Sequence, residues 1–296
     1  MKKFLPVNVA LLIVLAIIWG SSYILMKRGL DSFSAVQVSM LRILFAFFAL
    51  LPFLPAAIKT FNKTDVKYAL VVALIGSGVP SYLYPLAITH VDSSITGVIN
   101  TLTPLFTMLF AWAFFQFKPT IAKVVGLVIA LAGAGMLVVK SGSQMAFAID
   151  FYALMAVLAT VCYGLSSNIL KSKLNHVKAA PLTALTFALI GPFALVILLS
   201  TDFIDVLQSH PKALQSLMYI GLLGVVGTAL ALVLFNYLIK RTDALYASSV
   251  TFLMPVVAMF WGFMDKEQIG YTHLIGFVLV LVGVFMTNRF KSKALK

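Results

Sequence analysis

Charged residues are scarce in this sequence. Only 10% of the 296 residues are charged, whereas 61% are hydrophobic, and the mean hydropathy is +1.04. Soluble domains are roughly a quarter charged, so this chain has too few charges to cover a water-facing surface of its size. The composition excludes an ordinary soluble domain and indicates a protein whose solvent is the lipid bilayer.

Residues that build disulfides, metal sites and active sites are also rare. Cys162 is the single cysteine, which excludes an internal disulfide, and the four histidines form no pair at metal-ligand spacing. The sequence has no HExxH or GxSxG motif and no pair of carboxylates within an apolar run. We therefore expect no metal, no cofactor and no enzymatic activity. A membrane-embedded enzyme or an assembly subunit is the least favoured alternative.

Basic residues outnumber acidic ones by 22 to 9, which gives a formal net charge of +13. In a soluble protein such an excess indicates nucleic-acid binding, but no basic run here is interleaved with aromatic residues on a polar scaffold. Cytoplasmic loops of membrane proteins collect Lys and Arg. We therefore attribute the excess to membrane topology and expect no nucleic-acid partner.

The apolar residues fall into ten runs, each near the length of about 20 residues that a helix needs to cross a bilayer core ~30 Å thick. They cover residues 7–26, 33–54, 68–88, 93–117, 121–139, 149–170, 179–199, 214–239, 244–264 and 271–287. The sequence therefore predicts an all-α integral membrane protein with ten transmembrane helices and short connections.

The loop charges indicate the orientation of these helices. With ten spans, sixteen of the 22 Lys and Arg residues lie on the side that holds both termini, and five lie on the other side. Because Lys and Arg gather in cytoplasmic loops, we expect a multi-pass protein of the cytoplasmic (inner) membrane with both termini in the cytoplasm.

The two halves of the chain resemble each other at a nearly constant offset. The matched positions are Gly20, Ser22 and Lys27 with Gly164, Ser166 and Lys171 at an offset of 144, and Asp92 and Pro104 with Asp243 and Pro255 at 151. We divide the chain into five-helix repeats, residues 1–140 and 141–296. Five is an odd number, so the second repeat enters the membrane inverted, an arrangement that places a site near the midplane and permits alternating access. A duplication kept only for folding is the alternative.

Several of these residues carry a resemblance to a known family. The sequence Ile-Trp-Gly-Ser-Ser-Tyr at 18–23, Arg42, Pro104 and the face from Gly126 to Gly133 resemble an EamA repeat of the drug/metabolite transporter superfamily. The resemblance covers essentially the whole chain as two repeats. It implies an inverted fold of five plus five helices around a central cavity, with spans five and ten peripheral, and export of amino acids or other small metabolites.

The chain departs from the family pattern after the fourth span of each repeat. The family often has a Gly-Glu pair there; the second repeat has Glu267, nine residues before Gly276, whereas the first has Phe117 at the comparable place before Gly126. Any role of this carboxylate is therefore confined to the second repeat.

Arg42 is the one charged residue in the middle of a predicted span, at a depth of roughly 14 Å by helical rise. An ionised side chain at that depth costs at least ~2.5–3.5 kcal/mol unless it faces a wet cavity or a partner. Two roles remain open. Arg42 either binds a carboxylate of the substrate or joins helices through carbonyl and hydroxyl groups.

Polar and aromatic residues form stripes at helical spacing on the spans expected to converge. Such stripes face protein or water rather than lipid. A hydrogen bond between helices is the better explanation for any single Ser or Thr, but several stripes on converging helices favour a cavity. Asn100 is the strongest polar candidate for substrate contact. The other candidates for substrate binding or for the cavity wall are Trp19, Ser22, Tyr23, Ser81, Tyr84, Thr96, Thr103, Tyr163, Ser248 and Thr251.

Proline and glycine suggest movement and assembly. Pro104 and Pro255 occupy repeat-related positions in mid-span, where proline removes a hydrogen bond and kinks a helix. We predict gating roles for them, with a static bend as the alternative. The small-residue face around Gly126 and Gly133 permits close helix contact and a homodimer.

No acidic residue lies in the middle of a span, which favours facilitated exit or exchange over proton coupling. We therefore predict a secondary transporter that moves small metabolites, foremost amino acids or related amphipathic compounds, outward across the cytoplasmic membrane. The alternative is an exporter of another small solute, such as a drug-like compound, a nucleobase or a sugar derivative.

Overall fold

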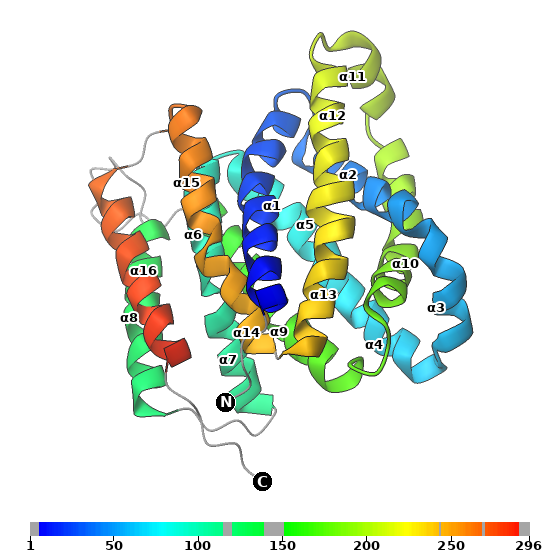
Figure 1. The fold of residues 1–296 in the computed structure, drawn as a ribbon. Helices are drawn as coiled ribbons and strands as arrows, with labels where there is room; N and C mark the ends of the chain where they lie inside the picture. The colour runs from blue at the N-terminus through cyan, green and yellow to red at the C-terminus, as the bar shows by residue number, and fades with distance from the viewer. Residues whose placement is uncertain (1–5, 115–119, 139–150, 243, 268–269, 290–296) are drawn as a thin grey trace.

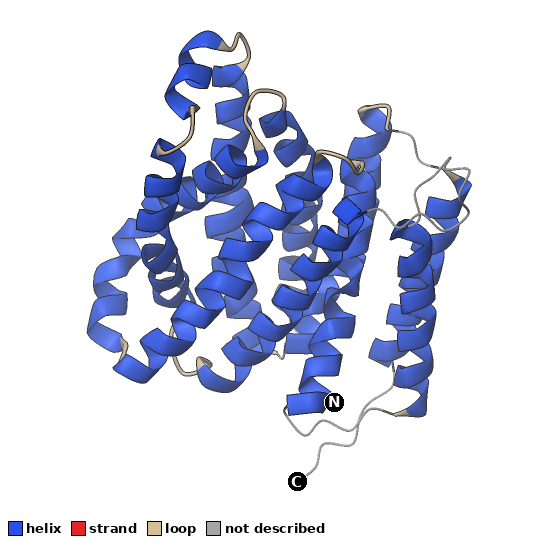
Figure 2. Ribbon diagram, turned by 180° about the vertical axis from the view of Figure 1, so that it is seen from behind, coloured by secondary structure: helices blue, strands red, loops and turns tan. Residues whose placement is uncertain are grey.

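The computed structural model describes residues 6–114, 120–138, 151–242, 244–267 and 270–289, and these residues contain helices and no strand (Figures 1 and 2). Eight helical runs are long and apolar enough to cross a membrane. They are Val7–Leu30, Ala35–Thr60, Lys63–Ile88, Ser93–Phe114, Phe151–Lys173, Ala179–Leu199, Ala213–Arg241 and Ala244–Met264. They correspond to the first four predicted spans of each half.

Two further helices stand at the places of the fifth and tenth predicted spans. Helix α8 (Ile121–Val138) and helix α16 (Tyr271–Arg289) pack against each other at one edge of the bundle (Figure 1). Within α16 the apolar stretch is the shorter segment Leu274–Gly283. The peripheral position of this pair agrees with the expectation for spans five and ten, while the count of ten spans stays a prediction.

The first two spans of each half begin the bundle. In the first half they are α1 (Pro6–Leu30) and the run of α2 (Ala35–Leu50), the 3₁₀ turn η1 (Leu51–Phe53) and α3 (Leu54–Thr60). In the second half they are α9 (Phe151–Lys173) and α10 (Ala179–Leu199), followed by the short α11 (Phe203–Ser209). Ser34 with Gln37 and Asn62 with Asp65 form capping boxes, which satisfy free N–H groups where α2 and α4 begin.

The third and fourth spans are interrupted in the same way in both halves. A π-helical turn lies inside each third span: η2 (Leu74–Gly78) between α4 (Lys63–Ala73) and α5 (Val79–Ile88), and η4 (Val225–Leu230) between α12 (Ala213–Gly224) and α13 (Ala231–Arg241). A 3₁₀ turn lies inside each fourth span: η3 (Asn100–Leu102) between α6 (Ser93–Ile99) and α7 (Thr103–Phe114), and η5 (Ser249–Phe252) between α14 (Ala244–Ser248) and α15 (Met254–Met264). These shared breaks extend the repeat seen in the sequence to local geometry.

Pro104 and Pro255 occupy the second residue of the helix that follows each 3₁₀ turn. Proline is tolerated in the first turn of a helix because the N–H that it lacks has no partner there. The two prolines therefore begin new helical segments, α7 and α15, instead of kinking an otherwise continuous helix.

Hydrogen bonds at the helix ends establish the direction of each repeat. Arg241 at the end of α13 donates to Asn8 at the start of α1 over 3.1 Å, and we call this side of the bundle face A. Ser216 near the start of α12 donates to the carbonyl of Arg28 near the end of α1 over 2.8 Å, on the opposite side, face B. Lys171 near the end of α9 donates to Ile239 O at 3.0 Å, on face A. Helix α9 thus ends where α1 begins, and the repeat-related helices run in opposite directions.

Glycine permits the closest helix contacts in equivalent places. A Cβ on Gly20 of α1 would lie 2.6 Å from Val257 Cβ of α15, and one on Gly164 of α9 would lie 2.7 Å from the backbone nitrogen of Thr107 in α7. The first span packs on the ninth, and the sixth packs on the fourth. Both of these repeat-related contacts depend on a glycine, which has no side chain.

We predict that Gly164→Ala destabilises the protein by roughly 1–3 kcal/mol, because the added methyl group overlaps backbone that cannot move aside. The measurement is thermal unfolding of the purified protein in detergent. The matched control is Gly221→Ala, whose Cβ would lie 3.8 Å from Phe45, so that its unfolding temperature stays level or rises. Equal unfolding temperatures for the two variants would contradict the packing argument.

Candidate functional site

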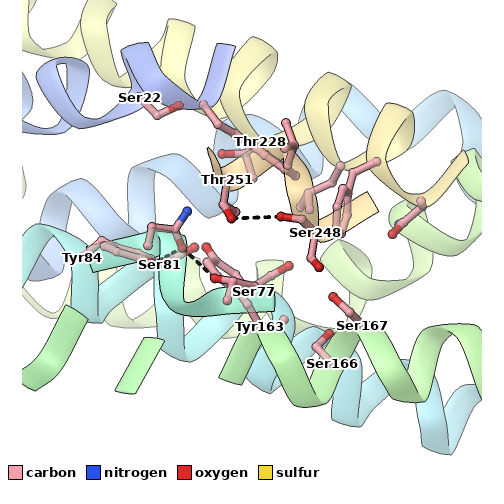
Figure 3. A pocket seen from close by; sticks show the side chains of 18 of the residues that line it. Ser22, Ser77, Ser81, Tyr84, Tyr163, Ser166, Ser167, Thr228, Ser248 and Thr251 are labelled. Carbon is pink, nitrogen blue, oxygen red and sulfur yellow. Dashed lines mark hydrogen bonds between the residues drawn. The ribbon is translucent and has the colours of Figure 1, made fainter. Parts of the chain in front are cut away.

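A cavity lies among the first four spans of both halves and holds about 1000 Å³ of empty space, counted out to its open mouth. Figure 3 shows its polar side chains pointing toward one another from different helices. Its walls are Trp19, Ser22, Tyr23, Met26, Arg42, Val72, Gly76, Ser77, Ser81, Tyr84, Asn100, Thr103, Tyr163, Ser166, Ser167, Leu170, Thr183, Thr186, Thr228, Leu232, Phe235, Asn236, Ser248, Val250, Thr251 and Met254.

Arg42 reaches this cavity from the middle of α2 and is 6% exposed. Its Nε donates to Thr228 Oγ1 over 2.7 Å, and its Nη1 lies 3.8 Å from Met26 Sδ. Thr228 lies in the π-helical turn η4, and its hydroxyl donates in turn to Leu223 O, five residues earlier in α12. The π turn therefore places an acceptor beside the guanidinium, which keeps further N–H donors for a ligand.

Asn100 lies at the 3₁₀ turn of the fourth span and is held from two sides. Its Oδ1 accepts from Tyr84 Oη at 2.6 Å and from Thr103 Oγ1 at 3.0 Å, and its Nδ2 lies 3.7 Å from Met254 Sδ. Sulfur is a weak acceptor, so the amide N–H₂ retains capacity to donate to a ligand.

Aromatic rings form one wall of the cavity. Tyr84 stacks on Tyr163 with 5.9 Å between ring centroids and meets Tyr23 edge to face at 5.7 Å. Trp19 packs edge to face on Phe235 at 5.0 Å, and its Nε1 donates to Gly227 O over 3.0 Å. These rings offer apolar surface beside the polar groups, which suits an amphipathic ligand.

Hydroxyl and amide groups continue the polar surface toward face A. They include Ser166, Ser167 and Thr183 (the first two in Figure 3), and Asn236 Nδ2 donates to Thr183 Oγ1 over 3.0 Å. These residues lie within about two helical turns of the helix ends on face A. The wall of the cavity therefore extends much of the way to that face.

Arg42 is the only charged side chain among the described residues of the cavity wall. No carboxylate is among the described residues that line this space, and these parts of the chain contain no group of three or more His, Cys, Asp or Glu residues placed to hold a metal ion. A single cation in a partly dehydrated cavity attracts an anionic group far more strongly than it would in bulk water.

The structure brings nearly all of the sequence candidates together. Arg42, Asn100 and the other predicted contact residues line the one cavity, with Thr96 as the exception. Thr96 is fully buried, and its hydroxyl donates to Asp92 O within its own span. The backbone at the start of α6 therefore satisfies the Thr96 hydroxyl, and Thr96 is not among the residues that line the cavity. Pro104 and Pro255 do not line the cavity. Each follows, by two or three residues in the sequence, a 3₁₀ turn that does, η3 or η5.

Several wall residues were missed because each was judged on its own helix. Applying the offset of 144 to Ser22 and Arg42 leads to Ser166 and Thr186, and the offset of 151 leads from Ser77 to Thr228. All three residues reached in this way line the cavity. The repeat, carried over residue by residue, was the available signal.

Comparison with known proteins follows the same division into halves. The sequence profile described as "EamA-like transporter family" matches residues 7–139 and 150–289. The chain is 24% identical to "Uncharacterized transporter YoaV" of Bacillus subtilis (strain 168), over 94% of this chain and 95% of the relative. It is 28% identical to "Uncharacterized inner membrane transporter YedA" of Escherichia coli (strain K12), over 88% and 83%.

Two further similarities extend the comparison. The chain is 21% identical to the "Probable terminal-alkyne amino-acid exporter" of Streptantibioticus cattleyicolor, over 94% of this chain and 92% of that one. A solved crystal structure superposes with a TM-score of 0.67 at 15% sequence identity and covers 96% of both chains. At that identity the superposition shows a shared fold.

We predict that Tyr84→Phe lowers the free energy of unfolding by about 0.5–1.5 kcal/mol, because Asn100 loses a buried hydrogen bond. Thermal unfolding in detergent measures the change. Tyr82→Phe serves as the control, since Tyr82 is 36% exposed on the same helix. A destabilisation by Tyr82→Phe as large as that by Tyr84→Phe would contradict the special position of the Tyr84 hydroxyl.

Proposed function

Because this chain belongs to the EamA-like transporter family, we propose that it is a secondary transporter that moves small metabolites, foremost amino acids, outward across the cytoplasmic membrane. The observation that carries this proposal is the cavity between the repeats, with Arg42 as the only charged side chain of its described wall. Named relatives are transporters, and one is named as an amino-acid exporter.

Arg42 is the proposed anchor for a substrate carboxylate. A guanidinium can bind a carboxylate with two parallel hydrogen bonds. Of the five N–H donors of Arg42, Nε donates to Thr228 Oγ1 and Nη1 points at Met26 Sδ, a weak acceptor. Asn100 and the hydroxyl groups would bind the polar remainder of the substrate, and the tyrosine wall its apolar part. The other role considered for Arg42 is to join helices, and its hydrogen bond to Thr228 does so between α2 and η4.

Alternating access is the proposed mechanism of movement. Two observations support this mechanism: α1 and α9 run in opposite directions, and the third and fourth spans are broken at matching places in both halves. In such inverted repeats, each half can adopt the conformation of the other, which moves the opening of the cavity from one face to the other. Pro104 and Pro255 are the proposed hinge positions, because each follows a 3₁₀ turn that lines the cavity.

Energy coupling is proposed to be facilitated exit or exchange. The described wall of the cavity holds no Asp, Glu or His, the groups that carry protons in many transporters.

An exporter of a different small carboxylate is the second candidate, since Arg42 would recognise the carboxylate in either case. The Gly126 and Gly133 face, considered for a homodimer, packs here against Gly276 and Gly283 of the same chain.

The charges on the two faces support the proposed orientation. Face A carries the basic ends of helices, including Lys59, Lys171 and Arg241, with Asp65 as the one described carboxylate there. Face B holds the other described acidic residues, which are Asp31, Asp92, Asp202, Asp205, Asp265 and Glu267. By the preference of Lys and Arg for the inside, we propose that face A, where α1 begins, is the cytoplasmic side and that both termini are cytoplasmic.

We predict that proteoliposomes containing the wild-type protein release selected labelled amino acids, and that Arg42→Ala and Arg42→Lys reduce the flux at least tenfold. Lysine keeps the charge but loses the bidentate geometry. Asn100→Ala is expected to weaken transport less severely. Lys59→Ala, an exposed charge outside the cavity, is the control and should transport normally.

Normal flux through a folded Arg42→Ala protein would overturn the proposed role of Arg42. If no amino acid moves through correctly inserted wild-type protein, the amino-acid assignment falls, and other small carboxylates become the next substrates to test.

We also predict the side on which each face is exposed. In a Cys162→Ala background, Lys212→Cys on face B should react with an impermeant maleimide added to intact cells, whereas Lys59→Cys on face A should react only after the membrane is opened. The reverse pattern would contradict the proposed orientation and leave the cavity chemistry untouched.

A further inference from the structure

A cluster of ion pairs joins three spans at face B. Lys27 Nζ lies 2.5 Å from Asp265 Oδ2 and 2.8 Å from Glu267 Oε1, and Arg28 Nη2 donates to Asp265 Oδ1. Glu267 also accepts from the start of the fourth span. We call this set the Glu267 lock; its members are Lys27, Arg28, Ser93, Ser94, Asp265 and Glu267.

Glu267 is the centre of the lock. Its side chain is fully buried, and its two oxygens accept from Ser93 Oγ at 2.5 Å, from the Ser93 N–H at 3.2 Å and from the Ser94 N–H at 2.9 Å, in addition to Lys27. Burial by itself would raise the pKa of Glu267, but the hydrogen bonds from Lys27, Ser93 and Ser94 lower that pKa to about 2. The carboxylate is therefore ionised at physiological pH and fully supplied with donors.

The lock lies between the cavity and face B. Its helices α1, α6 and α15 belong to the spans that line the cavity through Met26, Asn100 and Met254. Beyond those residues, toward face B, come Lys27 and the start of α6. Gly262 permits the contact, because a Cβ there would lie 2.7 Å from both Glu267 Oε2 and Ser94 Cβ. Separating these three spans at face B would open the cavity on that side.

The opposite face is held differently. Lys171, the repeat-related partner of Lys27, donates to the carbonyls of Ile239 and Thr242 over 3.0 and 2.9 Å. On face A, the described part of the chain has one contact between a basic nitrogen and a carboxylate: His176 Nε2, in the turn after α9, lies 3.2 Å from Asp65 Oδ1 of α4. The repeat symmetry is thus broken at the lock, whose cluster of ion pairs has no counterpart among the described residues of face A.

We propose that the Glu267 lock is the gate of the cavity at face B: when formed it closes the cavity there, and its separation opens the cavity to that side. Buried ion pairs are close to balanced against hydration of the separate ions. Water that enters on opening can therefore replace the protein donors, and both conformations remain accessible. This inference rests on the proposed transport function only for its purpose, because access to the cavity is measurable without a substrate.

The test measures access to a cysteine in the cavity. In a Cys162→Ala background, Ser22→Cys places a thiol on the cavity wall, and a membrane-impermeant methanethiosulfonate is applied to face B or face A in vesicles of known orientation. With the lock intact, labelling from face B is expected to be slow. Glu267→Gln and Lys27→Gln should each speed labelling from face B at least tenfold, and slow labelling from face A.

Two controls separate the lock from charge in general. Asp31→Asn removes a carboxylate from the same face, but its pair with Arg28 is 3.7 Å long and about 40% exposed on each side chain; its labelling rate should equal that of the unmodified lock. Lys27→Arg keeps the cation and should also label slowly. If Glu267→Gln does not fold, Lys27→Gln decides, because the Lys27 side chain is already 31% exposed.

Unchanged labelling in folded Lys27→Gln protein, or equal acceleration by Asp31→Asn, would overturn the gate. These outcomes are distinct from failure of the proposed function. Altered labelling without any metabolite flux would leave the gate standing and remove the substrate assignment, whereas flux with unaltered labelling would remove the gate alone.

Discussion

The hydrocarbon layer contains no water to bond with a free N–H or C=O group, and this constraint shapes the whole bundle. A break in a transmembrane helix must therefore face protein or a wet cavity. The π turns η2 and η4 and the 3₁₀ turns η3 and η5 all contribute residues to the cavity wall. Thr228 of η4 shows the use of such a break, because its hydroxyl donates to Leu223 O of α12 and also accepts the hydrogen bond from Arg42 Nε. Backbone irregularity and ligand-binding capacity thus arise from the same residues.

Symmetry between the repeats accounts for the architecture, and departures from symmetry account for its chemistry. Gly20 and Gly164 make equivalent helix contacts in the two halves. Arg42, by contrast, corresponds to the neutral Thr186, so the cavity has one cation in place of two or none. Lys27 meets carboxylates, whereas Lys171 meets carbonyls. A symmetric scaffold can exchange two conformations. The residues that differ between the repeats are the ones on which the proposed substrate binding and the proposed gate depend.

Much of the fold followed from sequence patterns that report the solvent of each residue. Long apolar runs located the eight described spans, and the constant offset identified the halves. Most of the predicted site residues line the cavity, since a polar residue on an apolar helix avoids lipid. The breaks in the third and fourth spans were not found, because a π or 3₁₀ turn leaves no distinct pattern in a continuous apolar run. Thr96 was misplaced for a related reason: its spacing matched the stripe, but its hydroxyl binds its own helix.

The sequence by itself determined that the chain is a membrane protein and how it divides into repeats. It also determined that Arg42 lies at a depth where it needs a wet cavity or a polar partner. Those properties depend on composition and period along the chain, which neighbours in space do not alter. Only the tertiary structure decided that Tyr84, Asn100 and Thr103 share hydrogen bonds beside the Arg42 site, and that Glu267 pairs with Lys27 at face B. Lys27 and Glu267 are 240 residues apart in the chain. Such contacts depend on the packing of helices that are distant in sequence, and a local sequence pattern does not reveal that packing.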